Sequence, residues 1–162
     1  MKIKAWTFTI CAMALLLTGL SGCVNNLISK GGVSNNAPTT TPGGTSTATT
    51  LDSYKRDLAY RIVAVNSTRV YTGRPQALLR AVIVVKFYVD ADGKLVRSEI
   101  IRTNKDLAAE AAALSSVRSA APFPKPESHL LRKGQVEVSE SWLFNDDGRF
   151  QLRSIADAQM DQ

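Results

Sequence analysis

Residues whose side chains could act as nucleophiles, bases or metal ligands are few in this chain. Among 162 residues there is one histidine, His129, and there are two cysteines, Cys11 and Cys23. Ser–His–Asp and Cys–His catalysis need a histidine beside the nucleophile, and zinc enzymes need several nitrogen, sulfur or carboxylate ligands. His129 falls in an expected loop after Pro126, where we interpret it as a solvated residue. The sequence therefore predicts a non-enzymatic protein with no catalytic residue, no metal and no cofactor.

Two groups of carboxylates resemble sites but lack essential members. Residues 90–93 (DADG) start like a calcium-binding loop, but Lys94 holds the fifth position and Ile101 the twelfth, where ligands belong. These residues are interpreted as a turn, with a glycine able to adopt positive φ. Glu137 and Glu140 are three residues apart, which places them on opposite faces of a strand. They are not expected to form a catalytic pair.

The N-terminus has the pattern of an export signal. Lys2 and Lys4 precede an uncharged, mainly apolar stretch that runs to residue 20. That stretch is shorter than the roughly 20 residues that cross a bilayer as a helix. An uncleaved membrane anchor is a second interpretation, because no charge follows until Lys30.

The stretch ends in Leu20, Ser21, Gly22 and Cys23, which resembles a bacterial lipobox. The resemblance implies that the Cys23 sulfur is lipidated and that residues 1–22 are a signal peptide. Two or three acyl chains would then anchor the protein firmly in a membrane. An ordinary signal peptide with a chance cysteine is the alternative. Because residue 24 is valine rather than the aspartate of many inner-membrane lipoproteins, the resemblance favours an outer-membrane lipoprotein facing the periplasm.

Composition then divides the exported chain into a tether and a domain. Gly, Ser, Thr, Asn and Pro dominate residues 24–50, so residues 23–50 are predicted to be a lipidated cysteine and a flexible linker. Residues 51–162 are predicted to be one folded domain. The chain has 20 basic and 14 acidic residues, a net charge of +6. The basic residues are scattered rather than clustered, so no nucleic-acid partner is expected.

Hydrophobic periodicity predicts an α+β domain. A helix over 53–66, capped by Asp52 or Ser53, has the expected buried residues Tyr54, Leu58, Ile62 and Val65. Strands are expected over 81–89 and 94–102, and then a helix over 105–120 that is capped by Asn104. The expected buried residues of this helix are Leu107, Ala111, Leu114 and Val117 or Arg118. Strands over 135–144 and 149–153 complete an antiparallel three- to four-stranded sheet with two helices on one face.

Three features together resemble the TonB/TolA C-terminal domain family. They are the order of these elements, an alternating strand before an Asp-Gly turn at 83–93, and a Pro-Phe-Pro-Lys-Pro segment at 122–126. The resemblance covers about residues 54–150. It implies a periplasmic module that binds envelope or outer-membrane proteins, partly by strand addition. The candidate edge is the strand over 135–144, of which one face carries Gln135, Glu137, Ser139 and Ser141. Trp142 is expected in the core, although it could also anchor a partner.

Two features depart from that family. The family's anchors span the membrane and couple to a proton-driven motor, and TonB carries a histidine there, whereas this chain has a lipobox and no histidine in that segment. The linker is also short. The first hypothesis is therefore a membrane-anchored lipoprotein that binds envelope proteins. The alternative is an inner-membrane TonB-type energy transducer with an uncleaved anchor. The sequence leaves the partner, the cargo and the oligomeric state open.

Overall fold

The structure is a computed structural model, and it describes residues 43–160. The predicted lipidation site at Cys23 and the cleavage motif at Leu20, Ser21 and Gly22 lie outside the described residues. The elements are α1 (Leu51–Val65), β1 (Ala81–Asp90), β2 (Leu95–Arg102), α2 (Leu107–Ala120), β3 (Gln135–Phe144) and β4 (Phe150–Leu152). Two short 3₁₀ turns, η1 (Ser67–Arg69) and η2 (Ser128–Leu130), lie in the connections.

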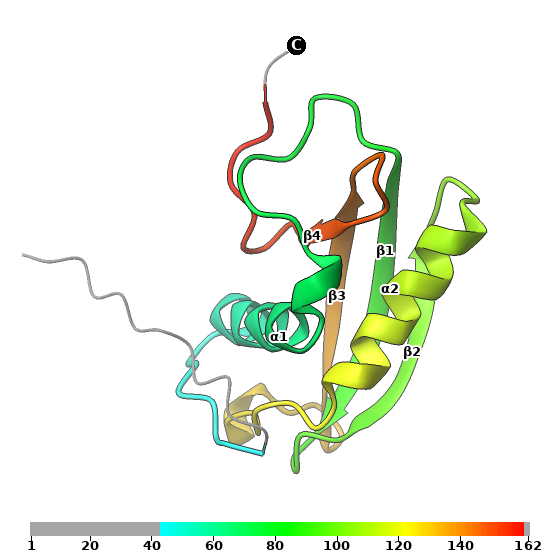
Figure 1. Cartoon of the computed structure of the whole chain (residues 1–162). Coiled ribbons are helices and arrows are strands. Elements are labelled where there is room, and N and C mark those ends of the chain that lie inside the picture. The colour runs from blue at the N-terminus through cyan, green and yellow to red at the C-terminus, as the bar shows by residue number, and fades with distance from the viewer. Residues whose placement is uncertain (1–42, 161–162) are drawn as a thin grey trace, which may run out of the picture. The chain divides into compact units, whose positions relative to one another are not determined.

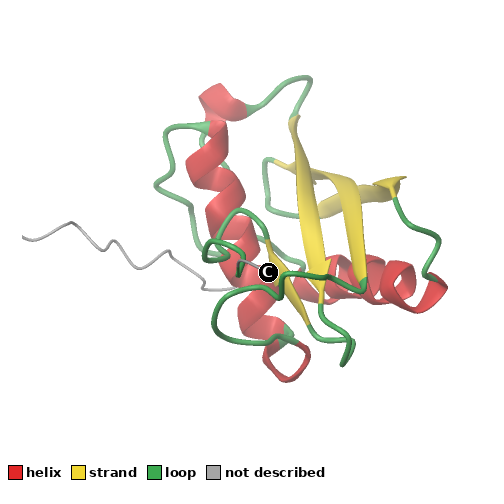
Figure 2. Cartoon of the chain, turned by 90° about the horizontal axis from the view of Figure 1, so that it is seen from above, coloured by secondary structure: helices red, strands yellow, loops and turns green. Residues whose placement is uncertain are grey.

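The four strands form one antiparallel sheet in the order β2-β1-β3-β4 (Figure 1). Helix α2 packs over β1 and β2, whereas α1 packs against β3 and β4. Side chains of both helices join the inward-facing residues of β1 and β3 in one core, so both helices lie on the same face of the sheet, at a steep angle to each other (Figure 2). The predicted α+β class, with two helices on one face of an antiparallel sheet, is confirmed. The opposite face of the sheet, here called the open face, has no helix over it among residues 43–160.

Both helices begin at caps that differ from the predicted ones. Thr50 caps α1, because its side chain accepts from the Ser53 N–H and the Ser53 side chain bonds back to the Thr50 backbone. Asp106, rather than Asn104, caps α2 by accepting from the Ala109 N–H at 3.0 Å. The hydrogen bond from the Arg80 guanidinium, and then that from Ala109, hold the pKa of Asp106 below its usual value.

The predicted buried face of α2 is wrong at several positions. Leu107 is 78% exposed, and Ala111 is also exposed. The buried residues are Ala109, Ala112, Ala113, Ser116, Val117 and Ala120. In a helix this rich in alanine, the small side chains set the contact face because they allow close approach to the sheet. Leu107 is the first helical residue and lies at the end of that contact. Val65, at the last residue of α1, is likewise exposed.

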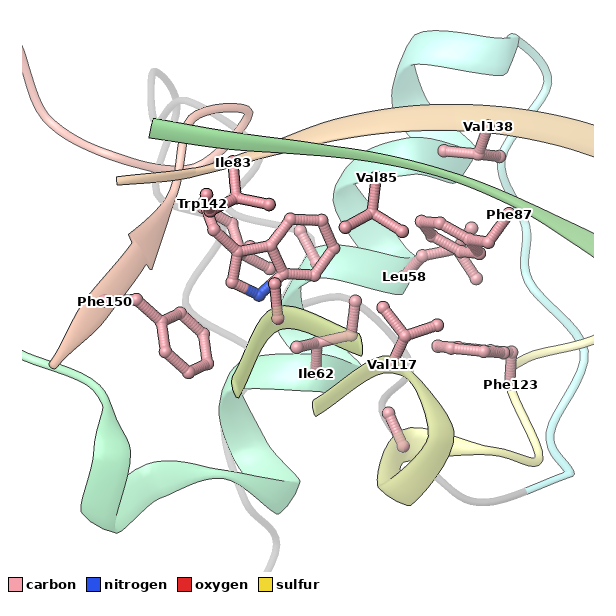
Figure 3. Packing of buried hydrophobic residues seen from close by; sticks show 14 of the residues in the cluster. Leu58, Ile62, Ile83, Val85, Phe87, Val117, Phe123, Val138, Trp142 and Phe150 are labelled. Carbon is pink, nitrogen blue, oxygen red and sulfur yellow. The ribbon is translucent and has the colours of Figure 1, made fainter. Parts of the chain in front are cut away.

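Most of the predicted core positions are confirmed. The alternating side chains of β1 point toward the helices, and Figure 3 shows them meeting residues of both helices and β3. The cluster includes Ile83, Val85 and Phe87 of β1, Tyr54, Leu58 and Ile62 of α1, Val117 of α2, and Trp142 of β3. Trp142 is fully buried, and its indole Nε1–H donates to the Ser116 hydroxyl at 2.9 Å.

The domain begins earlier than composition predicts. The Lys125 N–H donates to the Gly44 carbonyl at 2.8 Å, and the Ser46 N–H donates to the Lys125 carbonyl at 2.9 Å. The Ser46 hydroxyl donates to Asp57 of α1 at 2.5 Å, and Ala48 joins the core. Residues 44–48 therefore belong to the folded unit, because small polar residues can form backbone bridges without contributing a large apolar surface.

Candidate functional site at the edge of the sheet

Strand β3 lies between β1 and β4, so it is not the outermost strand of the sheet. It pairs with β1 along its whole length, but β4 pairs only with residues 142–144 of β3. Figure 1 shows β4 reaching only one end of β3. The prediction of an edge strand is therefore corrected: only residues 135–141 border an open edge.

Hydrogen bonds at the two ends of this edge show which main-chain groups face outward. Arg132 and Gln135 exchange N–H to carbonyl bonds of 2.8 and 3.2 Å, and the Arg153 N–H donates to the Ser141 carbonyl at 3.0 Å. Alternate residues of a strand direct their N–H and C=O to the same side. Glu137 and Ser139 therefore also direct theirs away from β1. Within residues 43–160, these two residues have no strand partner on that side.

The side chains of β3 alternate as the sequence predicts. Gln135, Glu137, Ser139 and Ser141 lie on the open face, where Glu137 and Ser139 are exposed and the other two are half-buried. Val136 and Val138 point to the helix side of the sheet, where they are buried in the core. The structure brings the four predicted site residues onto one surface, and it directs Glu137 to the opposite face from Glu140, as expected.

Glu140 is a buried acid whose role the sequence analysis did not identify. It is 2% exposed, on the helix side of the sheet. Its carboxylate accepts from the Ser141 N–H at 2.6 Å and from the Ser154 hydroxyl, and it lies 3.9 Å from the Lys55 ammonium. One signal in the sequence could have identified it: Glu140 is an acid at a position where the strand alternation predicts a buried, apolar residue. Its contacts tie β3 to α1 and to the segment after β4.

A groove of about 600 Å³ adjoins the open edge of β3 at its Gln135 end. It is lined by Leu51 of α1, Leu130 of η2, Val136 and Glu137 of β3, Tyr88 of β1, and the basic residues His129, Arg132 and Lys133, with Gln135. Within the described residues, Arg132 and Lys133 form no ion pair. The groove thus combines apolar side chains with two unpaired cations.

The groove's wall is held in place by local bonds. His129 Nε2 donates to the Thr49 carbonyl at 2.8 Å, which joins η2 to the start of α1. Lys133 and Gly134 both have positive φ and form a two-residue turn between the bonded residues Arg132 and Gln135. The turn therefore presents the two cations at the end of β3.

The other candidate positions of the sequence have structural roles here. The Asp90 carboxylate accepts from the N–H groups of Asp92 and Lys94 at 2.9 Å each, which confirms the turn. Among residues 43–160, no three His, Cys, Asp or Glu side chains gather as metal ligands would. Neither helix in that range has the length and apolarity needed to cross a membrane.

Comparisons with known proteins give one significant relative. No protein-family profile matches the chain, and no solved structure matches it. Protein TonB from Pseudomonas putida is 32% identical over 71 residues, which is 44% of this chain and 29% of that protein. The chain thus matches less than a third of the relative's length. Over that part of its length, this chain is TonB-like.

Proposed function

We propose that the chain is a TonB-like, non-enzymatic protein of the cell envelope, whose domain binds an outer-membrane or other envelope protein along β3. The observation that carries the proposal is the open edge at Glu137 and Ser139, next to a groove with apolar and basic side chains. The similarity to TonB supports the cell-envelope assignment.

The physical basis is strand addition. Unpaired N–H and C=O groups at a sheet edge bind an extended segment through main-chain hydrogen bonds, and nearby pockets take its alternate side chains. Glu137 and Ser139 offer two N–H and two C=O groups between the Arg132 turn and β4. Leu51 and Leu130 would contact an apolar side chain of the segment at the groove end.

Replacing Ser139 with proline tests this mode. The change removes an N–H that faces away from β1, so the β1–β3 pairing is kept while the edge loses a donor. Binding is read out in living cells with a photocrosslinking residue in place of Glu137. We expect Ser139→Pro to lower the crosslinks to envelope proteins at least roughly fivefold, because one hydrogen bond is missing and the edge is distorted. Crosslink yield is measured against the unchanged Ser139 protein.

Ser139→Ala is the matched control, because it keeps the N–H and removes only the hydroxyl. It should crosslink like the parent. Thermal unfolding of both variants shows whether the fold is kept. Equal crosslinking by a folded Ser139→Pro variant would rule out strand addition at this edge, and equal losses in both variants would assign binding to the side chain instead.

The proposal includes a lipid anchor at Cys23 in the outer membrane, supported by the Leu20–Ser21–Gly22 motif. The intact mass of the protein from its own membranes tests it. We expect the loss of residues 1–22 and the addition of acyl groups. A mass that retains the N-terminus would instead favour the inner-membrane TonB-type energy transducer, whose activity should then disappear when the proton gradient collapses.

A further inference from the structure

A row of four residues crosses the open face at the end of the sheet near β4. Arg102 of β2 pairs with Val84 of β1, and Val84 pairs with Ser141 of β3. Arg153, which follows β4, continues the row because its N–H donates to the Ser141 carbonyl. Directly opposed residues of antiparallel strands project from the same face. One arginine thus lies at each end of the row, with Val84 and Ser141 between them.

The charge of this row contrasts with the rest of the open face. Lys86 lies 3.2 Å from Glu99, and the hydrogen bond that its ammonium donates to that carboxylate raises the pKa of Lys86. Arg97 stacks 3.9 Å from the Tyr88 ring centroid. Within residues 43–160, neither Arg102 nor Arg153 has an ion pair.

The row forms the floor of a groove of about 730 Å³. The half-buried Val82 and Val84 add apolar surface to the floor, above the buried Leu143, and Pro75 and Leu79 form one wall. Residues 156–159 form the other wall and include Asp157, an acid that has no ion pair among the described residues.

Hydrogen bonds hold the two walls together. The Arg74 guanidinium donates to the carbonyls of Ala158 and Gln159 at 3.0 and 2.7 Å, and the Gln159 side-chain amide donates to the Gln76 carbonyl at 2.6 Å. The groove is therefore built by the fold rather than by chance contact of loose ends. Leu78, next to Leu79 in the chain, is 74% exposed and leaves further apolar surface uncovered.

We propose that this groove binds a single acyl-chain anion, such as a fatty acid or an alkyl phosphate. The anionic group would lie between Arg102 and Arg153, with the Ser141 hydroxyl as a further donor, and the chain would lie over Val82 and against Leu79. Three inter-strand steps of about 4.8 Å separate the arginines' backbones, a distance that two extended arginine side chains span.

The geometry favours an acyl chain over a peptide. The main-chain groups beneath the groove are used in the β1–β2, β1–β3 and β3–β4 pairings, so the face of the sheet offers none to a ligand. A peptide lying on it would bury amides without partners, which is unfavourable. An acyl chain buries no polar group of its own, and at its anionic end the two unpaired guanidinium groups of the groove outnumber its one acid, Asp157.

Calorimetric titration with dodecyl phosphate below its micelle concentration tests the proposal. The described residues share one hydrophobic core, so residues 36–162, which omit the predicted signal peptide and lipidation site, are used. We expect saturable 1:1 binding, weakened at least about tenfold in Arg102→Gln/Arg153→Gln, because charge-assisted hydrogen bonds are lost. The control Arg56→Gln/Arg118→Gln removes the same charge from exposed helix positions and should bind like the parent.

Two further probes identify which part of the ligand is recognised. Inorganic phosphate and dodecyl maltoside, a neutral amphiphile, should each bind at least about tenfold more weakly than dodecyl phosphate, because each lacks one of its two recognised parts. Equal binding of phosphate would overturn the acyl-chain assignment, and equal binding of maltoside would overturn the anion assignment. Equal weakening in both double variants would show a general effect of charge and overturn the site.

Discussion

Gly93→Ala is expected to lower the free energy of unfolding by at least about 3 kcal/mol. Gly93 has φ +82°, and a Cβ there would lie 2.1 Å from the Phe123 carbonyl oxygen. The positive φ costs an alanine about 1–2 kcal/mol, and the clash with backbone adds to it. Relief would require moving Phe123, whose N–H donates to the Gly93 carbonyl at 2.8 Å and whose ring is buried in the core. Urea unfolding followed by circular dichroism measures the change.

Gly148→Ala is the matched control for that experiment. Gly148 has φ +79°, nearly the same as Gly93, but its added Cβ would meet only the end of the flexible Arg80 side chain at 3.6 Å. We expect a loss of about 1–2 kcal/mol from the backbone conformation alone. If both variants lost the same free energy of unfolding, the close approach of the β1–β2 turn to Phe123 would make no contribution to the cost of an alanine at residue 93.

Trp142→Ala is expected to destabilise the domain by about 3–5 kcal/mol, the range for truncating a large buried aromatic residue. Trp142 is fully buried among residues of α1, α2 and the sheet, so its removal leaves a cavity where all three meet. It also leaves the Ser116 hydroxyl without the indole N–H, although Ser116 still donates to the Ala113 carbonyl at 2.8 Å. Thermal and urea unfolding followed by circular dichroism measure the loss.

Trp142→Phe separates packing from hydrogen bonding. It keeps an aromatic ring but loses the bond to Ser116, and Trp142→Phe/Ser116→Ala removes both partners of that bond. We expect the single phenylalanine variant to lose clearly less stability than Trp142→Ala. An equally large loss would show that the hydrogen bond, rather than the packing, dominates at this position. A small effect of Trp142→Ala itself would contradict the central position that the structure gives to the indole.

The local elements could largely be predicted because their signals lie within a few consecutive residues. The alternation of Ile83, Val85 and Phe87 indicates a strand with one buried face, and the DADG turn joins it to its neighbour. The cap of α1 was misplaced because Thr50, Asp52 and Ser53 are all acceptable caps. The buried face of α2 was misplaced because its many alanines give a weak apolar pattern, so that packing against the sheet decides its orientation.

Local sequence patterns were enough to specify an α+β domain, its strands and helices, and the set of polar residues on one face of β3. The assembled fold set where that strand lies in the sheet and how little of it β4 covers. It also decided that residues 44–46 join Lys125 and that Arg102 and Arg153 share a row. These relations join residues far apart in the chain. They depend on strand order and register, which local propensities do not specify.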